Sequence, residues 1–429
     1  MMVMPMNGSH EDVKIGGYEG NRHSSVSTEL PKYQEFNLKQ WPTVTAGLMP
    51  RLCKPNPPEG IANTEDQRMW SSHLGALDRI YKMRDRQLVN SSLLITHKTN
   101  TYHIVSKRPR FSSFNMPRLA GIANFNPEKD IPSLTNKVIL VTGGTGGLGE
   151  QSIRALAKHG PQHIYFTGRN QKAADAIMND INAENSGVEL TFLQMDFSSL
   201  ESVRAGIKQF AHDRLDILIC NAGVMAVPPA VSKDGFEVHF AINHLAHAMI
   251  IQKLLPFLTR TADMPNSDVR VVCLTSEGWK GHPSGGILYD KVRTDKGGMP
   301  IWLLRYGQSK FANLVYAAEL GRRFPKLMTV SVHPGVVRTD LVNTSSFADS
   351  AFLYIANAIQ GVSILTPEEG VLNQLWAAAG ANRNDLFNGA YYIPVGVLSN
   401  SDVNKDKTAK NEELANKLWT WTSEILDSL

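Results

Sequence analysis

A tyrosine and a lysine four residues apart form the most chemically pointed pair in the 429-residue sequence. In Tyr306-Gly-Gln-Ser-Lys310 this spacing predicts that both side chains lie on one helical face, one turn apart. A free phenol has a pKa of about 10, and a nearby ammonium favours the phenolate and lowers that pKa. Tyr306 can then give a proton to a forming alkoxide or take one from an alcohol. The same spacing also occurs in ordinary amphipathic helices, so its context has to decide.

A glycine-rich turn lies between a short apolar run and a helical pattern. The run Val138-Ile-Leu-Val141 is typical of a buried parallel strand, and Thr142-Gly-Gly-Thr-Gly-Gly-Leu-Gly149 follows it. Glycines let the backbone approach a pyrophosphate, and the helix N-terminus supplies unpaired N–H groups. Glycine also marks ordinary corners, but strand, turn and helix together favour a dinucleotide site. The expected cofactor contacts here are Thr142, Gly143, Gly147, Leu148 and Gly149.

Two charged residues follow the next two strand-like runs. Arg169 stands where NAD-selective sites carry an acidic residue for the ribose 2′-hydroxyl, and an arginine there can bind a 2′-phosphate instead. The sequence therefore favours NADP(H) over NAD(H), although Arg169 can also be a solvated loop residue. Asp196 can accept a hydrogen bond from the adenine amino group, or cap the following helix.

Strand-like runs alternate with helix-length segments after Lys137. This alternation predicts an α/β fold, in which a Rossmann-type, doubly wound parallel sheet of about seven strands carries helices on both faces of a single domain. The runs are 138–141, 163–167, 189–194, 217–220, 269–274, 329–332 and 391–393.

The ordered motifs between Asn126 and Gly396 resemble the short-chain dehydrogenase/reductase superfamily. Within it, the chain is most similar to the retinol dehydrogenase and WW-domain oxidoreductase-like branch, and to fungal members of that branch. The motifs are the glycine turn, Asn221-Ala-Gly223, Asn243-His-Leu-Ala-His247, Leu274-Thr-Ser276, Tyr306-Gly-Gln-Ser-Lys310 with Asn313, His333-Pro-Gly-Val-Val-Arg-Thr339, Thr366-Pro-Glu-Glu-Gly370 and Gly389-Ala-Tyr-Tyr-Ile-Pro394.

The resemblance implies a role for each matching residue. Tyr306 is the expected general acid/base, and Lys310 is expected to lower its pKa and to bind the nicotinamide ribose. Ser276 is expected to hydrogen-bond the substrate oxygen. The other implied roles are a water held by Asn243, a cofactor channel lined by Asn221 and Gly223, and carboxamide contacts from Val337 and Thr339.

The interval of 30 residues between Ser276 and Tyr306 is long for the superfamily. We expect it to shape the substrate pocket, and Tyr289 is no rival base because Arg293, not a lysine, lies four residues on. No zinc pattern is evident in the sequence. His244 and His247 lack a carboxylate or cysteine at ligand spacing and are interpreted as packing histidines.

Apolar side chains dominate the segment 336–360, which the resemblance places over the active site. They indicate an apolar ketone, aldehyde or secondary alcohol as substrate, unless they only pack against the core. The sequence thus predicts an NADP(H)-dependent oxidoreductase, with a role in secondary-metabolite biosynthesis suggested by resemblance alone. The alternative is a dinucleotide-sensing scaffold with little turnover, which the complete set Ser276, Tyr306, Lys310 and Asn243 disfavours.

The first 115 residues differ from the remainder. They supply the positive excess behind the net charge of +4 and show no sustained periodicity. We expect a mostly disordered N-terminal extension at 1–115, a catalytic domain at 116–398 and a tail at 399–429 with one amphipathic helix. The extension is interpreted as an appendage, an interaction or targeting arm, or the product of a wrongly assigned start upstream of Met116.

The composition narrows the partners and the compartment. A net charge of +4 is too weak to indicate nucleic-acid binding. Three scattered cysteines form no disulfide framework, no secretory signal is recognised, and no apolar run is long enough to span a membrane. We therefore expect a cytoplasmic enzyme, with peripheral membrane contact through 351–365 and a homodimer left open.

Overall fold

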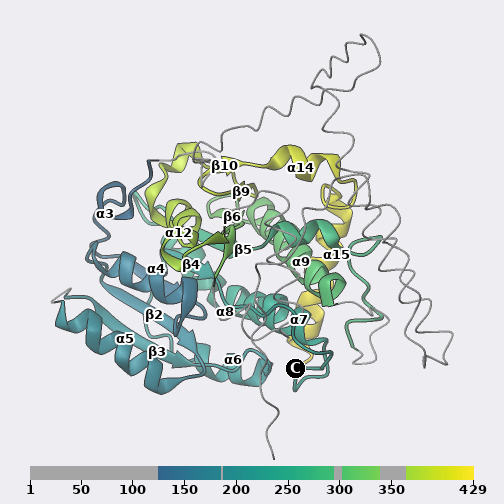
Figure 1. The fold of residues 1–429 in the computed structure, drawn as a ribbon, viewed down its shortest axis with the longest axis horizontal. Coiled ribbons are helices and arrows are strands. Elements are labelled where there is room, and N and C mark those ends of the chain that lie inside the picture. Colours follow the sequence, from purple (N-terminus) through teal and green to yellow (C-terminus); the bar gives the residue numbers. More distant parts are fainter. Residues whose placement is uncertain (1–123, 185–186, 294–301, 339–363) are drawn as a thin grey trace, which may run out of the picture. The chain divides into compact units, whose positions relative to one another are not determined.

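A mostly parallel β-sheet with helices on both faces organises the protein (Figure 1). The computed structural model describes residues 124–184, 187–293, 302–338 and 364–429. The expectations for residues 1–115, for Thr339 and for the apolar segment up to 360 fall wholly or mainly outside these ranges. None of the described helices combines the length and the hydropathy needed to cross a membrane.

The main sheet has eight strands in the order β10-β9-β6-β5-β4-β1-β2-β3. Its strands are β1 Val138–Val141, β2 His163–Gly168, β3 Glu189–Gln194, β4 Ile217–Cys220, β5 Arg270–Leu274, β6 Met328–Val332, β9 Tyr391–Ile393 and β10 Val397–Leu398. A second sheet pairs β7 Val336–Val337 with β8 Ile364–Leu365. The expected count of about seven was too low. The strands missed by the sequence analysis, β7, β8 and β10, span two residues each, too few to show a period.

Strand order reverses at β1, which lies between β2 and β4. In open α/β sheets, ligands bind beyond the carboxyl ends of the strands at such a switch point. The glycine turn follows β1, and the Asn221-Ala-Gly223 motif follows β4. The topology therefore brings these two motifs to one edge of the sheet.

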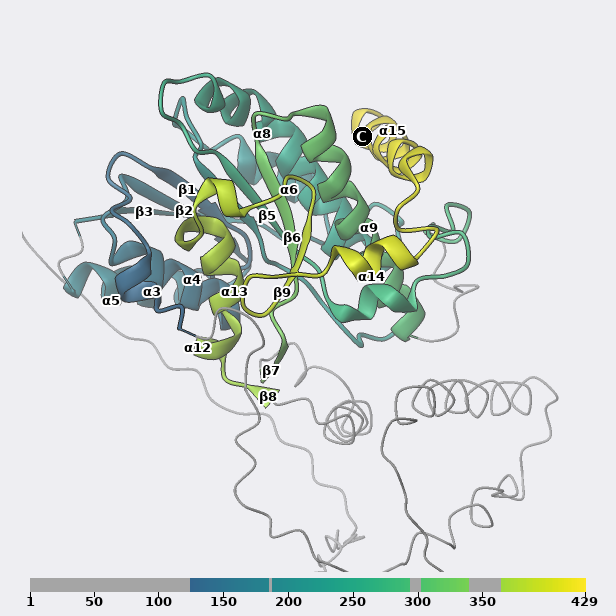
Figure 2. The same cartoon turned by 90° about the horizontal axis from the view of Figure 1, so that it is seen from above.

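Two apolar clusters cover the two faces of the sheet, as alternate β1 side chains show: Val138 and Leu140 join one cluster, Ile139 and Val141 the other. The first face carries α6 Leu200–Ile207, α8 Ala246–Ala262 and α9 Trp302–Arg323. The second carries α4 Gly147–Ala157, α5 Gln171–Ala183 and α13 Leu372–Leu375. Figure 2 shows the sheet between these layers.

The expected amphipathic C-terminal helix is present as α15, Glu412–Asp427. It lies against α9 (Figures 1 and 2), where Leu418 is fully buried and the ring of Trp419 stacks on that of Tyr316 with centroids 4.7 Å apart. A short helix, α14 Asn400–Lys405, precedes it. The remaining short helices are α3 Pro127–Asp130, α7 Val238–Phe240, α12 Pro367–Gly370, the π turns Ala241–Leu245 and Trp376–Gly380, and the 3₁₀ turns Glu277–Gly281 and Arg383–Asp385.

Candidate active site

Tyr306 and Lys310 both lie on α9, as their spacing predicts. They are almost completely buried, with 6% and 5% of their surfaces exposed. The Lys310 Nζ lies 5.8 Å from the centroid of the Tyr306 ring. The helix thus places a phenol next to an amine, and their burial largely excludes water from both groups.

Ser276 joins this pair from the carboxyl end of β5. Its hydroxyl caps the short 3₁₀ turn by accepting a hydrogen bond from the Gly278 N–H at 3.1 Å. A Cβ at Gly278 would lie 2.9 Å from the Tyr306 ring and 3.4 Å from the Ser276 Oγ, so only glycine leaves these two side chains in contact distance. The structure thus brings Ser276 and Tyr306 together despite the interval between them in sequence.

Burial raises the pKa of Tyr306 to about 12, and a hydrogen bond with Ser276 only partly offsets this. The physical reason is that water no longer stabilises the phenolate. The effect of Lys310 on this pKa, implied by the resemblance, stays a prediction. At neutral pH Tyr306 is a protonated phenol, which is the form that can donate a proton.

The Lys310 ammonium is held by the last carbonyl of β5. Its Nζ donates to the Leu274 oxygen at 3.1 Å, and the Asn313 amide donates to the same oxygen at 3.1 Å. The Thr275 hydroxyl in turn donates to the Lys310 carbonyl at 2.7 Å, which fixes α9 against β5. Burial lowers the pKa of Lys310 to about 8, so the ammonium form still prevails at neutral pH.

Asn243 lies in the π turn Ala241–Leu245, within the helical stretch that runs from α7 to α8. Its side-chain amide is fully used: Oδ1 accepts from the Val224 N–H at 2.8 Å, and Nδ2 donates to the Val224 carbonyl at 3.0 Å and to the Ser309 Oγ at 2.9 Å. Ser309 donates to the Tyr306 carbonyl, so Asn243 is tied to α9. The water contact expected of Asn243 stays a prediction.

Gly223, which follows the end of β4, lies close to Asn243 and Lys310. A Cβ there would lie 3.1 Å from the Asn243 Oδ1 and 3.6 Å from the Lys310 Nζ. Two residues earlier, the Asn221 amide donates to the Thr142 carbonyl at 2.8 Å. The segment 221–223 thus links the glycine turn to Lys310.

Several positions of the glycine turn have a backbone conformation or a close backbone contact that only glycine allows. Gly143 and Gly147 have φ values of 67° and 53°, a region that side chains disfavour. A Cβ at Gly149 would collide with the Gly143 carbonyl. At Gly146, the N-cap of α4, a Cβ would meet no described atom within 4 Å, and no side chain caps this helix. The N-terminus of α4 is therefore an open cradle of backbone N–H groups.

Thr142 organises the base of this cradle. Its hydroxyl accepts from the backbone N–H groups of Asn221 at 2.8 Å and Ala222 at 2.9 Å, and contacts the His247 Nε2 at 2.8 Å. The His247 Nδ1 lies 2.9 Å from the Asn243 carbonyl, which can only accept, so Nδ1 carries the hydrogen and Nε2 accepts from Thr142. Burial lowers the pKa of His247 to about 4 and keeps this ring neutral.

His247 is a residue whose role the sequence analysis missed. We interpreted it as a packing histidine, yet it connects the glycine turn to the Asn243 backbone. The available signal was the interval of four residues between Asn243 and His247, which places both on one helical face.

Arg169 and Asp196 follow β2 and β3. Arg169 is exposed, and its carbonyl accepts from the Gln194 amide at 3.0 Å. Asp196 is half-buried. Burial alone raises its pKa, but hydrogen bonds from Ser198 and the Lys233 ammonium outweigh this and leave the pKa lowered. Ser199, not Asp196, is the N-cap of α6, so the capping alternative for Asp196 was wrong.

Leu148 and Val337 meet at the side of the turn that faces α12. A Cβ at Gly370 would collide with Val337 and lie 3.1 Å from a methyl group of Leu148. Val337 is buried and pairs with Leu365. Thr339, the remaining predicted contact, lies outside the described residues.

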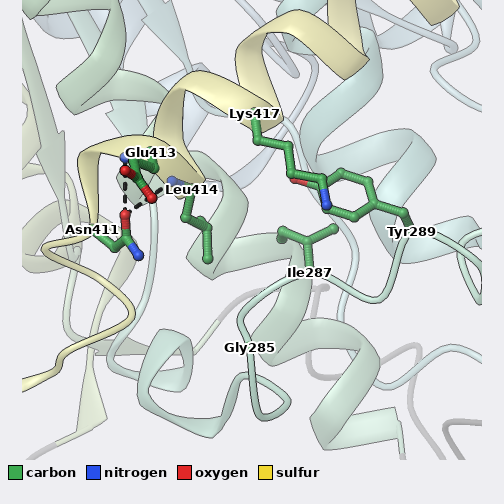
Figure 3. A pocket seen from close by; sticks show the side chains of 7 residues that line it. All are labelled: Gly285, Ile287, Tyr289, Asn411, Glu413, Leu414 and Lys417. Carbon is green, nitrogen blue, oxygen red and sulfur yellow. Dashed lines mark hydrogen bonds between the residues drawn. The ribbon is translucent and has the colours of Figure 1, made fainter.

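The stretch after Ser276 packs partly against α15 and not only around the active site. A pocket of about 260 Å³ opens there, lined by Gly285, Ile287, Tyr289, Asn411, Glu413, Leu414 and Lys417 (Figure 3). The Lys417 Nζ lies 4.9 Å from the centroid of the Tyr289 ring. Burial raises the pKa of Tyr289 to about 12, and no lysine from α9 accompanies it. Ser276 and Lys310 are not among the residues that line this pocket, so Tyr289 belongs to a different place from the Tyr306 site.

Comparisons with known proteins agree with this fold. The family described as short chain dehydrogenase matches residues 137–290. Short-chain dehydrogenase/reductase drtF of Aspergillus calidoustus is 34% identical over 311 residues, which cover 69% of this chain and 95% of the relative. Retinol dehydrogenase 11 of Homo sapiens is 30% identical over 300 residues, covering 68% of this chain and 86% of the relative.

A solved structure of an uncharacterized protein from Mycobacterium paratuberculosis aligns with a TM-score of 0.53 and 25% identity. The alignment covers 70% of this chain and 97% of that protein. Between 86% and 97% of each of these relatives is thus matched. The chain belongs to the short-chain dehydrogenase/reductase family, and it is an oxidoreductase that acts on CH–OH and C=O groups.

Proposed function

We propose that the protein is an NADP(H)-dependent reductase of apolar ketones or aldehydes, which can also oxidise the matching alcohols. The observation that carries this proposal is the set of buried Tyr306 and Lys310 with half-buried Ser276, in which a protonated phenol and a hydroxyl lie side by side. Two hydroxyls that converge on one oxygen can polarise a carbonyl without a metal.

The residues around the glycine turn fit a dinucleotide. The uncapped N-terminus of α4 offers backbone N–H groups to a pyrophosphate, and the exposed Arg169 offers a guanidinium to a 2′-phosphate. Val337 would lie beside the nicotinamide and Lys310 beside its ribose. Bound there, the cofactor would supply or accept the hydride.

The proton chemistry belongs to the chain itself. Ser276 would hold the substrate oxygen, and Tyr306 would donate its phenolic proton as negative charge develops on that oxygen. The neighbouring Lys310 ammonium would stabilise the phenolate that remains. A new proton would come from solvent water and reach Tyr306 by way of the neighbouring Lys310 ammonium. Because Tyr306 is protonated at neutral pH, it is in the form that reduction of a carbonyl requires.

The substrate proposal rests on chemistry and on one relative. Retinol dehydrogenase 11 is named for an apolar alcohol. An apolar substrate also suits a site whose catalytic side chains are almost fully buried. A role in secondary metabolism stays a prediction from the resemblance. So do the cytoplasmic location, the homodimer and the division at residues 115 and 398.

The alternative function, a dinucleotide-sensing scaffold, requires different residues in the site. A protein that only senses the dinucleotide needs the glycine turn but no proton donor. The buried Tyr306 and Lys310 carry a desolvation cost that such a protein has no reason to keep. We therefore favour catalysis.

Replacing Arg169 tests the cofactor proposal. Losing a charge-assisted hydrogen bond costs about 1.5–3 kcal/mol, so in Arg169→Ala we expect KM for NADPH to rise roughly 10- to 100-fold. The KM for NADH should change little, because that cofactor lacks the 2′-phosphate. Steady-state kinetics with a panel of hydrophobic ketones and aldehydes would measure both. Lys208→Ala removes an exposed charge elsewhere and serves as the control. Equal losses with both cofactors would contradict the role of Arg169.

A further inference from the structure

Three potential metal ligands meet at the edge of the sheet opposite the glycine turn. His163 begins β2, Glu189 begins β3, and His212 lies in the loop between α6 and β4. One ligand atom from each lies within 4.8 Å of the other two. The His163 Nδ1 is 2.9 Å from the His212 Nε2 and 3.3 Å from the Glu189 Oε2.

The central imidazole is rigidly held. His163 is nearly buried, and its Nε2 is 2.8 Å from the Thr191 hydroxyl. Its ring stacks on Tyr165 with centroids 4.0 Å apart, and the His212 ring meets it edge-on. A metal-ligating histidine is typically oriented in this way, by a hydrogen bond to the nitrogen that does not bind the ion.

The Nδ1 atom of His163 has two close neighbours in the cluster. The Nδ1 atom of an imidazole carries at most one hydrogen. Two partners, an imidazole nitrogen and a carboxylate oxygen, face that single atom. If the His163 Nδ1 donates its hydrogen to one of these two partners, no hydrogen is left for a hydrogen bond to the other. A cation between the three atoms would satisfy all of them at once.

We propose that His163, Glu189 and His212 bind one divalent transition-metal ion of the zinc type. In a tetrahedral zinc site with bonds of about 2.0–2.1 Å, ligand atoms lie roughly 3.3 Å apart. The distance between His163 and Glu189 already matches. The His212 Nε2, 2.9 Å from the His163 Nδ1, has to move slightly away from that atom and approach the Glu189 carboxylate, which lies within 4.8 Å of it. Two imidazoles and a carboxylate suit zinc better than magnesium or calcium. The exposed Glu189 side leaves room for water as the fourth ligand.

The position of this site indicates a structural metal site and not a catalytic one. Arg169 follows the far end of β2, about 20 Å away for a strand of six residues and its flanks. β3 is the edge strand of the sheet (Figure 1). An ion bound to His163, Glu189 and His212 would pin the starts of β2 and β3 to the loop after α6. The three ligands are 26 and 23 residues apart, so no local spacing marks them in the sequence.

Zinc binding to the full chain tests the proposal. Chelator-treated protein would be titrated with Zn²⁺ by calorimetry, and with Co²⁺ while visible absorption is recorded. We expect one strong equivalent, a cobalt spectrum typical of tetrahedral coordination, and a higher unfolding temperature with zinc. Glu189→Gln and His212→Gln should each weaken binding about 10- to 100-fold, the usual effect of disturbing a metal site.

His159→Gln, which removes a half-buried imidazole outside the cluster, should leave zinc binding unchanged. Glu189 is largely exposed, so its replacement should not impair folding even if that of His212 does. No strong equivalent, or one that survives in Glu189→Gln, would overturn the proposal. NADPH binding should be unaffected in these variants, which separates this test from that of the reductase function.

Discussion

At the scale of single residues, the site depends on the Lys310 ammonium, whose burial removes the water that would stabilise its charge. Lys310 is buried, and only the Leu274 carbonyl accepts from it among the hydrogen bonds of the described residues. Burial lowers its pKa from 10.5 to about 8. A group with a depressed cationic pKa destabilises the folded state whenever it is protonated. The charge beside Tyr306 is therefore held at a cost in stability.

Lys310→Met should consequently stabilise the protein without cofactor while abolishing turnover. One pKa unit is worth about 1.4 kcal/mol, which limits the gain at pH 7 to roughly 3 kcal/mol. Below pH 8, Lys310 is charged in both states and the full cost applies. Between pH 8 and 10.5 the folded protein loses the proton first, so wild-type stability rises and the difference shrinks.

Urea unfolding of both proteins at pH 7 and pH 10 would measure this difference. A variant less stable than the wild type at pH 7 would show that the ammonium is not under strain. A difference independent of pH would point to packing and not to charge.

The sequence predicted residues whose partners are near in the chain or fixed by family motifs. Tyr306 and Lys310 are an example, because helical periodicity alone brings them together. It did not predict the contact of His247 with Thr142, nor the cluster around His163. Both join residues from separate elements, and their distances depend on how the layers pack.

At the scale of elements, the junction between β1 and β4 holds the cofactor cradle in place. The Thr142 hydroxyl satisfies two backbone N–H groups and one histidine nitrogen, and its side chain is fully buried. Sequence periodicity predicted the strands of this junction. It could not predict β10, which is too short to show a pattern and exists because Val397 and Leu398 pair back onto β9.

Thr142→Val should destabilise the fold by roughly 2 kcal/mol or more, because it leaves buried donors unpaired. Cofactor affinity should fall as well, since the turn loses its anchor. Thr329→Val is a matched control: Thr329 is also fully buried, on β6, but its hydroxyl has no partner among the described residues. That change should be neutral or stabilising. Chemical denaturation and NADPH titration would compare the two, and equal effects would contradict the role given to Thr142.

At the scale of the whole molecule, the C-terminal helix is part of the structure that supports catalysis. α15 contributes Ala415, Leu418 and Leu426 to the same apolar cluster as α9. The sequence predicted an amphipathic helix in this tail. The structure shows that it covers α9, which carries Tyr306 and Lys310.

Leu418→Ala should therefore lower the free energy of unfolding by about 2–5 kcal/mol, the usual cost of a buried leucine. Because α9 loses support, turnover should also decline near the unfolding temperature before the rest of the sheet melts. Glu424→Ala, an exposed change on the same helix, is the control and should have little effect. A fully stable Leu418→Ala variant would mean that α15 is dispensable for the core.

The central claim is that Tyr306 supplies the proton in hydride transfer to a carbonyl. It is tested most directly by measuring turnover and NADPH affinity of Tyr306→Phe side by side, with Tyr289→Phe as the control. We expect Tyr306→Phe to lose turnover by about 10²–10⁴-fold and to keep its NADPH dissociation constant, while Tyr289→Phe keeps both. A Tyr306→Phe variant that still reduces ketones at the wild-type rate would contradict it.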